Sequence, residues 1–115
     1  MEMEQVLREC RFSKRYQGYY ALRECLGIAL ENEDTLQYMT GIYVEAAKRC
    51  PTSWHHVERN IRTMLDYSWK NGGREALEGI AGGVLYEKPT VGEVIEILTC
   101  YLKEHLDERR TDVRG

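Results

Sequence analysis

Residues 43–69 combine a short helical segment, a tight turn and a longer amphipathic helix, and this order constrains the fold more than any other feature of the chain. Pro51 belongs to the turn, because proline lacks a backbone N–H and clashes with the preceding helical turn. Thr52 or Ser53 is expected to cap the second helix by accepting a hydrogen bond from a free N–H group. This arrangement predicts a helix-turn-helix, whose second helix lies in the DNA major groove.

The predicted helix at residues 53–70 has a single apolar side. At about 100° per residue, one narrow sector contains Trp54, Val57, Ile61, Met64, Leu65 and Ser68. A stripe of this kind faces a hydrophobic core. Trp54 either fills the core beneath the turn, which we expect, or stacks at an interface with DNA or a partner.

The opposite side of the same helix is charged. Arg59 lies almost opposite the apolar sector. Glu58 precedes Arg62 by one turn, and Asp66 precedes Lys70 in the same way, an order that favours ion pairs on an exposed helix. Such a face is an ordinary solvated surface in many proteins, but the tight turn before it favours DNA binding.

Several segments resemble, in the same order, those of one known family. They are Gly18–Leu26 (GYYALRECL), Ile42–Arg49 (IYVEAAKR), Val57–Arg62 (VERNIR), Ser68–Gly72 (SWKNG) and Lys88–Thr90 (KPT). The chain resembles, from residue 16 to about residue 105, the C-terminal effector domain of the sporulation initiation master regulator, sporulation stage 0 protein A. The resemblance implies an all-α fold, a compact bundle of about six helices containing a helix-turn-helix, and sequence-specific binding of double-stranded DNA in bacterial transcription regulation.

The resemblance also implies roles for individual residues. In the family, the VER segment faces bases and a later arginine holds the duplex, which points to Glu58, Arg59 and Arg62. An arginine can bond O6 and N7 of guanine, and a glutamate can accept from the cytosine amino group. Thr52 and Ser53 suit a phosphate at the helix N-terminus. The full predicted DNA-binding set is Glu58, Arg59, Arg62, His55, Ser53, Thr52, Lys48 and Lys70.

The chain also departs from the family pattern. Family members carry an N-terminal receiver domain, whereas only about fifteen residues precede the matching region here, so we expect this chain to lack one. Trp54-His55-His56 replaces a smaller, partly basic stretch, and proline replaces a polar residue in the turn. The segment between Gly72 and Lys88 is shorter than usual. These differences bear on sequence preference and on control by phosphorylation.

Length and composition predict one globular domain. The 115 residues are 43% hydrophobic and 30% charged, a balance typical of a chain that folds around a core. Residues 1–15 are expected to form an N-terminal helix and a basic linker, and residues 108–115 a frayed tail. The sequence has no apolar run long enough to cross a bilayer and no signal peptide, which predicts a cytoplasmic protein.

The net charge of −3 constrains any DNA-binding hypothesis. Phosphate repels an acidic protein on average, so binding must come from a local basic surface. The expected basic residues are Lys48, Arg49, Arg59, Arg62 and Lys70, and the acidic ones are Glu87, Glu93, Glu96, Glu104, Asp107 and Glu108. We therefore expect a bipolar protein that binds DNA as a monomer or weak dimer. The alternative is a protein-interaction module or antagonist that pairs with a full-length regulator or RNA polymerase.

The remaining elements follow from periodicity and from helix-stop signals. Helices are predicted at 2–11, 18–31, 35–41, 43–49, 53–70, 74–80 and from Thr90 onward, where Glu93 completes a capping box. Asn71–Gly73 is expected to stop the 53–70 helix. Residues 84–86 are expected to be extended, and to pack against the domain rather than form a wing near DNA.

No catalytic, metal or cofactor site is predicted. His55 and His56 point about 100° apart on a helix and cannot chelate together, and His105 is distant in sequence. The cysteines contain no CxxC spacing, which favours buried, reduced thiols over a redox switch. They are Cys10, Cys25, Cys50 and Cys100.

Overall fold

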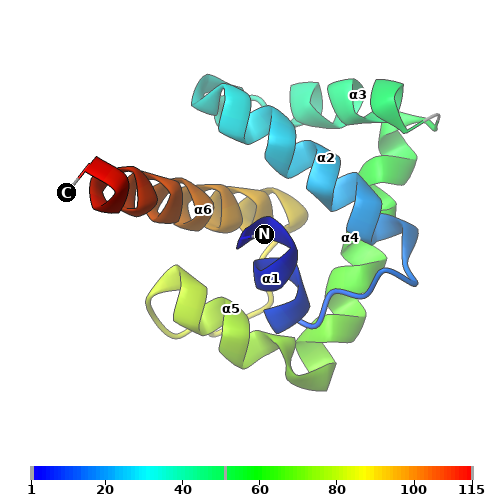
Figure 1. Cartoon of the computed structure of the whole chain (residues 1–115). Coiled ribbons are helices and arrows are strands. Elements are labelled where there is room, and N and C mark those ends of the chain that lie inside the picture. Colours follow the sequence, from blue (N-terminus) through cyan, green and yellow to red (C-terminus); the bar gives the residue numbers. More distant parts are fainter. Residues whose placement is uncertain (1, 51, 115) are drawn as a thin grey trace.

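The described part of the protein is helical throughout, as the sequence predicts. The structure is a computed structural model that describes the backbone of residues 2–50 and 52–114 and the side chains of residues 3–50 and 52–105. Its helices are α1 (Glu2–Glu9), α2 (Gln17–Glu31), η1 (Glu33–Gln37), α3 (Met39–Arg49), α4 (Trp54–Ser68), η2 (Trp69–Gly73), α5 (Arg74–Ala81) and α6 (Val91–Arg114) (Figure 1). The all-α fold class and the count of about six α-helices are therefore confirmed.

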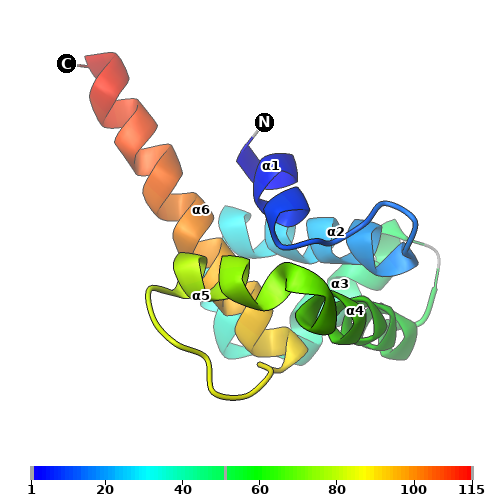
Figure 2. The same cartoon turned by 90° about the horizontal axis from the view of Figure 1, so that it is seen from below.

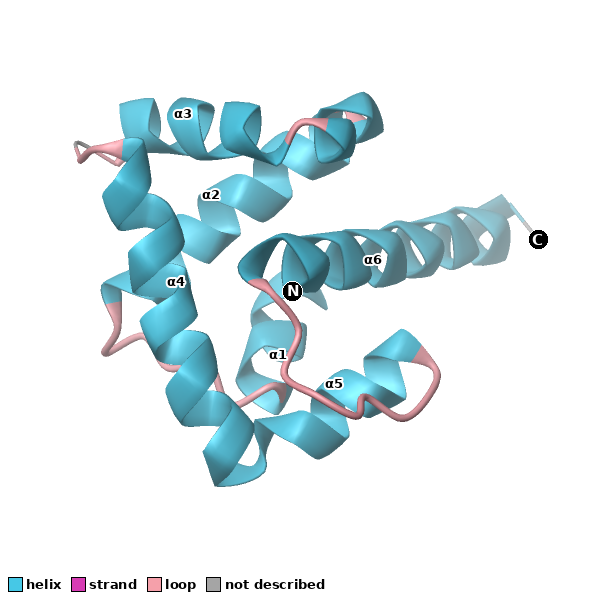
Figure 3. Ribbon diagram, turned by 180° about the vertical axis from the view of Figure 1, so that it is seen from behind, coloured by secondary structure: helices cyan, strands magenta, loops and turns pink. Residues whose placement is uncertain are grey.

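Helix α2 lies at the centre of the packing and contacts α3, α4 and α6. In Figure 3, α3 and α4 meet at a corner, and α6 runs away from α4 across the body of the domain. Apolar side chains from all six helices are buried in one cluster, which includes Leu7, Leu22, Leu26, Ile42, Ile61, Leu65, Leu77 and Leu98. Because α4 contributes one side to this cluster, its opposite side remains on the surface.

The backbones of α2 and α4 touch at Gly18. A Cβ atom at this position would lie 2.3 Å from the carbonyl oxygen of Asn60 and 3.0 Å from the Cα of Ile61. No side chain can occupy that space without moving one of the helices. The glycine in the GYY segment therefore sets how closely the first turn of α2 approaches the middle of α4.

The start of α3 differs from the sequence prediction. The sequence predicts a helix at 35–41, stopped or bent near Gly41, and a second helix at 43–49. Instead, η1 ends at Gln37 and α3 runs through Gly41. The side chain of Asn32 accepts a hydrogen bond from the Asp34 N–H (3.1 Å) and begins η1. A Cβ at Gly41 would lie 2.9 Å from the ring of Tyr38, so this glycine makes room for an aromatic ring and does not end a helix.

The predicted stop after α4 is present, but it leads directly into another helix. Gly72 has a φ of 98°, in the left-handed region that favours glycine. The segment Trp69–Gly73 is kinked, with non-helical φ/ψ angles at Asn71 and Gly72, and α5 begins directly after it at Arg74. Gly73 fits a tight space, since a Cβ there would lie 2.6 Å from the Cys10 carbonyl oxygen. Helix α4 is therefore joined to α5 through a kink, without a longer loop.

The segment between α5 and α6 is a loop in which Leu85 packs inward. The predicted extended segment forms no strand, and Val84 and Tyr86 are exposed. The Leu85 N–H donates to Glu78 (2.9 Å), and the Leu85 carbonyl accepts from Arg74 (2.8 Å). These two bonds hold the loop against α5, in agreement with packing in preference to a wing.

Helix α6 begins with the predicted capping box. The Thr90 N–H donates to the Glu93 carboxylate (2.8 Å), and the Glu93 N–H donates to the Thr90 hydroxyl (3.1 Å). The backbone is helical as far as Arg114, and the C-terminal half of α6 projects from the body (Figure 2). Fraying of the tail from residue 108 remains a prediction. Among the described residues, none of the helices combines the length and the apolar character needed to span a bilayer.

Candidate nucleic-acid interface

The apolar stripe of α4 faces the core, with one exception. Val57, Ile61, Met64, Leu65 and Ser68 are buried, and the Ser68 hydroxyl donates to the Leu65 carbonyl (3.1 Å). Trp54 is 37% exposed and lies outside the core cluster, contrary to our expectation that it fills the core. It is the first residue of α4, where the stripe extends past the packed interior, and its ring stacks on His55 at 3.7 Å between centroids.

Arg59 projects from the outward side of α4. The residue is exposed, and its guanidinium has no ion pair or hydrogen bond within the described part of the chain. It borders a shallow hollow of about 300 Å³, together with Gln17, Thr52, His56 and Asn60. Every residue of this lining carries hydrogen-bonding groups, so the surface around Arg59 can bind a polar partner.

The lining of this hollow is partly held by its own hydrogen bonds. The Asn60 amide donates to the Gln17 amide oxygen at 3.3 Å, which links α4 to the first residue of α2. The Thr52 hydroxyl lies 3.3 Å from Nδ1 of His56. These weak, exposed bonds can exchange for bonds to a ligand at little cost.

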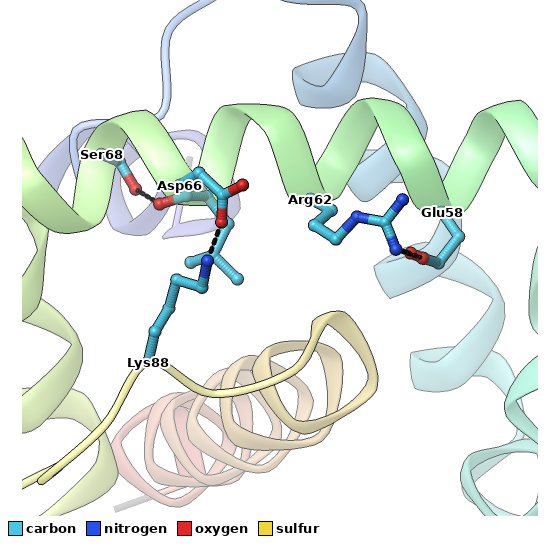
Figure 4. Close-up of polar contacts among 6 residues, drawn as sticks. Glu58, Arg62, Asp66, Ser68 and Lys88 are labelled. Carbon is cyan, nitrogen blue, oxygen red and sulfur yellow. Dashed lines mark hydrogen bonds and ion pairs between the residues drawn. The ribbon is translucent and has the colours of Figure 1, made fainter.

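Glu58 and Arg62 form an ion pair one turn apart, as the sequence predicts. Nη1 of Arg62 lies 2.8 Å from Oε1 of Glu58 (Figure 4). The Arg62 side chain is 56% exposed, whereas the Glu58 side chain is 22% exposed. Arg62 is thus accessible on the outward face of α4, and Glu58 lies at the edge of that face, where it is partly buried.

Asp66 pairs with Lys88 and not with Lys70, contrary to the predicted pair. Lys88 comes from the loop before α6 and reaches across to α4 (Figure 4). Lys70 lies in the segment Trp69–Gly73, which links α4 to α5. Lys70 is exposed at the end of α4, with no ion pair among the residues that the structure describes.

The two basic residues at the end of α3 are less available than expected. Lys48 pairs with Glu45 at 3.1 Å, although its side chain is 68% exposed. Arg49 turns toward α2, where it lies 3.5 Å from Glu24 and 3.9 Å from Glu31. The Lys48 side chain therefore remains largely exposed, whereas the charge of Arg49 is partly neutralised at the α2 surface.

Ser53 occupies the N-cap position of α4, but its side chain makes no capping hydrogen bond. The Ser53 carbonyl accepts from the N–H groups of His56 (3.0 Å) and Val57 (3.2 Å). The expected side-chain cap, from either Thr52 or Ser53, is absent, and the Thr52 hydroxyl instead contacts the His56 ring. Free N–H groups at this end of α4 are suited to an anion.

The four cysteines are free thiols in differing environments. Cys10 and Cys25 are buried as expected, and burial raises the pKa of each thiol to about 12. Cys50 is partly exposed and Cys100 is exposed, so the expectation of a buried thiol fails at Cys100, which lies on the outer side of α6.

Sequence reasoning missed three residues that border the predicted surface. Gln17 and Lys88 come from segments distant in sequence, and no local pattern places them beside α4. Asn60 lies about 100° around the helix from Arg59, so its position beside Arg59 could have been inferred from the helical period.

The comparison with known protein families assigns the chain. The family model described as "Sporulation initiation factor Spo0A C terminal" matches residues 3–102, which is most of the sequence. This range includes the whole of α3 and α4 and all eight predicted DNA-binding residues. The chain belongs to the sporulation initiation factor Spo0A C-terminal family, whose members are DNA-binding effector domains in transcription regulation.

Proposed function

We propose that the protein binds double-stranded DNA sequence-specifically, with α4 in the major groove as the second helix of a helix-turn-helix. Helices α3 and α4 contact one another, with α3 ending at Arg49 and α4 beginning at Trp54. Pro51, which the sequence predicts in the turn, lies outside the described residues. The outward face of α4 carries Glu58, Arg59 and Arg62. A B-DNA major groove accommodates a helix presented in this way.

Arg59 is the observation that carries the proposal. Its guanidinium is exposed, lies opposite the buried stripe and has no acidic partner in the described ranges. A free arginine at this position can bond O6 and N7 of a guanine, an interaction worth about 1–3 kcal/mol of discrimination. His55, Lys48 and Lys70 surround the face, with Thr52 and Ser53 at the helix N-terminus for a phosphate.

The Glu58–Arg62 ion pair is compatible with this role. An exposed i,i+4 pair contributes about 0.3–0.5 kcal/mol, which is less than a bidentate bond from arginine to guanine. Arg62 can therefore exchange Glu58 for a base or a phosphate when DNA approaches. Glu58 is then free to accept from a cytosine amino group.

The net charge of −3 shapes how binding occurs. Affinity must come from the local surface around Arg59 and is expected to be modest and salt-sensitive. Weak single-site binding favours a weak dimer on adjacent sites, or contact with RNA polymerase or a full-length regulator. A protein that regulates bacterial transcription in this way acts in the cytoplasm.

The proposal is tested by selecting a binding site from a randomised duplex pool and titrating it by fluorescence anisotropy. Arg59→Ala should cost about 1–3 kcal/mol and relax the base preference at one position. Lys103→Ala, on α6 and away from α4, is the control variant, because it also removes one positive charge. It should leave base preference unchanged.

Two results would contradict the proposal. Arg59→Ala could bind the selected site with unchanged affinity and base preference, in which case α4 does not read it. Alternatively, the wild-type protein could ignore duplex DNA even at low salt, where electrostatic binding is strongest. The second result would favour the protein-interaction module.

A further inference from the structure

A second large hollow lies outside the surface around Arg59. It has a volume of about 660 Å³ and lies where α1, the linker at residues 10–16 and the end of α4 meet. Its lining includes Arg8, Arg11, Ser13, Lys14, Tyr67 and Asn71. We call it the linker pocket. Its volume falls in the range of pockets that hold small molecules.

The linker pocket is rich in positive charge that other residues do not neutralise. The side chains of Arg8, Arg11 and Lys14 make no ion pair within the described part of the protein. Glu4 also borders the pocket, and it lies 3.9 Å from Arg23 on α2. Three cations face one carboxylate here, in a chain whose overall charge is negative.

Arg11 occupies a backbone position where glycine is usual. Its φ of 65° is in the left-handed region, and it is the single non-glycine residue with positive φ in the described residues. The Phe12 N–H donates to the Leu7 carbonyl (3.0 Å) and the Arg11 N–H to the Arg8 carbonyl (2.9 Å). These two bonds form a Schellman motif, in which the left-handed residue is most often glycine.

Arg11 keeps a side chain at a position where glycine would adopt the backbone conformation at lower cost. A left-handed conformation is costly for a residue with a Cβ atom, and such outliers cluster at functional sites. The Arg11 side chain extends over Gly72, where its Nε would lie 3.5 Å from a Cβ. This distance is an ordinary van der Waals contact, so the Arg11 side chain packs next to Gly72 at the end of α4.

We propose that the linker pocket binds a phosphate ester. Arginine and lysine side chains with a serine hydroxyl form a common phosphate-binding set. The exposed ring of Tyr67 can stack on a sugar or a base. Tyr67 lies eight residues after Arg59, about 80° around the helix, so the pocket opens beside the proposed reading face.

The phosphate can come from two sources, and position favours the DNA backbone. A duplex lying along α4 would bring phosphates toward Lys14 and Arg11, an arrangement that rests on the proposed function. A free nucleotide is the other source. In either case the three cations bind charge and carry no base preference.

The first experiment measures the salt dependence of DNA affinity. Log Kd is plotted against log salt for the wild type, Lys14→Gln, and Arg8→Gln/Arg11→Asn/Lys14→Gln. Asparagine suits the left-handed backbone at position 11. The slope should fall by about 0.9 for each phosphate that a variant no longer neutralises, equally on all duplex sequences. Lys103→Gln is the control with the same charge change as Lys14→Gln, and circular dichroism checks folding.

The second experiment adds pyrophosphate or ADP to ¹⁵N-labelled protein and follows amide chemical shifts. Shifts at residues 11–16 and 71–72 that vanish in the triple variant would assign the pocket to a free phosphate compound. An unchanged salt slope in the triple variant, with no such shifts in the wild type, would overturn the proposal. If the wild type fails to bind DNA, the proposed function is wrong. The amide shifts then decide separately whether the linker pocket binds a free phosphate compound.

Discussion

Nη1 of Arg62 lies 2.8 Å from Oε1 of Glu58. The family resemblance assigns both side chains to DNA binding, and in the absence of DNA they pair with each other. This ion pair keeps one of the outward cations of α4 neutralised until a competing anion arrives. Under the proposed function, the ion pair would act against binding to arbitrary sequences, since a phosphate would have to displace a carboxylate.

Glu58→Gln should release Arg62 and remove a negative charge from the face. We expect non-specific DNA affinity to rise severalfold and the salt slope to steepen by about one, while discrimination between target and random duplex falls. Anisotropy titrations on both duplexes measure this. Equal gains on target and random DNA, with discrimination unchanged, would show that Glu58 does not read a base.

Gly18→Ala should destabilise the fold, because its Cβ would lie 2.3 Å from the Asn60 carbonyl oxygen. The expected loss is about 1–3 kcal/mol in the free energy of unfolding, measured by urea denaturation. Gly27→Ala is the matched control on the same helix, with nothing within 4 Å of its new Cβ. It should gain about 0.5–1 kcal/mol. Equal effects at both positions would refute the close approach of α2 and α4.

Thr90→Ala should cost about 1 kcal/mol, because it removes the hydroxyl that accepts from the Glu93 N–H. Ser53→Ala should change stability by only a few tenths of a kcal/mol, since the Ser53 side chain makes no capping bond. Thermal and urea unfolding compare the two. If Ser53→Ala weakens DNA binding while leaving stability intact, the role proposed for Ser53 toward phosphate gains support.

Stability should fall at alkaline pH because of the two buried thiols. Burial raises the pKa of Cys10 and Cys25 from 9.0 to about 12. Below pH 9 the two thiols are protonated in both the folded and the unfolded protein, so their contribution to the free energy of unfolding is fully present. Above pH 9 the unfolded chain loses these protons and the folded chain keeps them, which lowers stability by about 1.4 kcal/mol per pH unit for each thiol.

Urea unfolding at pH 8 and pH 10, under reducing conditions, tests this dependence. The wild type should lose more stability between the two than Cys10→Ala/Cys25→Ala, which lacks both groups. Other titrating residues are common to both proteins, so the difference isolates the thiols. An identical loss in the two proteins would contradict the assignment.

The sequence predicts the helices best where a stripe of apolar residues is long. The predicted bounds of α4 are right within two residues at each end, because Val57, Ile61, Met64 and Leu65 repeat over several turns. The predicted start of α3 is wrong because a glycine at position 41 suggests a helix stop. The actual role of Gly41, which is to make room for the Tyr38 ring, depends on tertiary packing that spacing alone does not reveal.

The sequence predicts which side chains of the candidate interface point outward, but it does not predict all of their ion-pair partners. The helical period correctly places Arg59 and Arg62 outward, and it gives the Glu58–Arg62 pair. It fails for Asp66, whose partner Lys88 lies 22 residues further along the chain. It fails also for Trp54, because a helical wheel has no information on where the core ends.

The close approach of Gly18 to Asn60 fixes more than the distance between two helices. With backbone against backbone, α4 has no freedom to rotate about its own axis. The direction in which Arg59 points is thus fixed when the chain folds. Under the proposed function, adaptation to different duplex sequences would fall to the long side chains of α4, which can bend and extend while the helix stays in place.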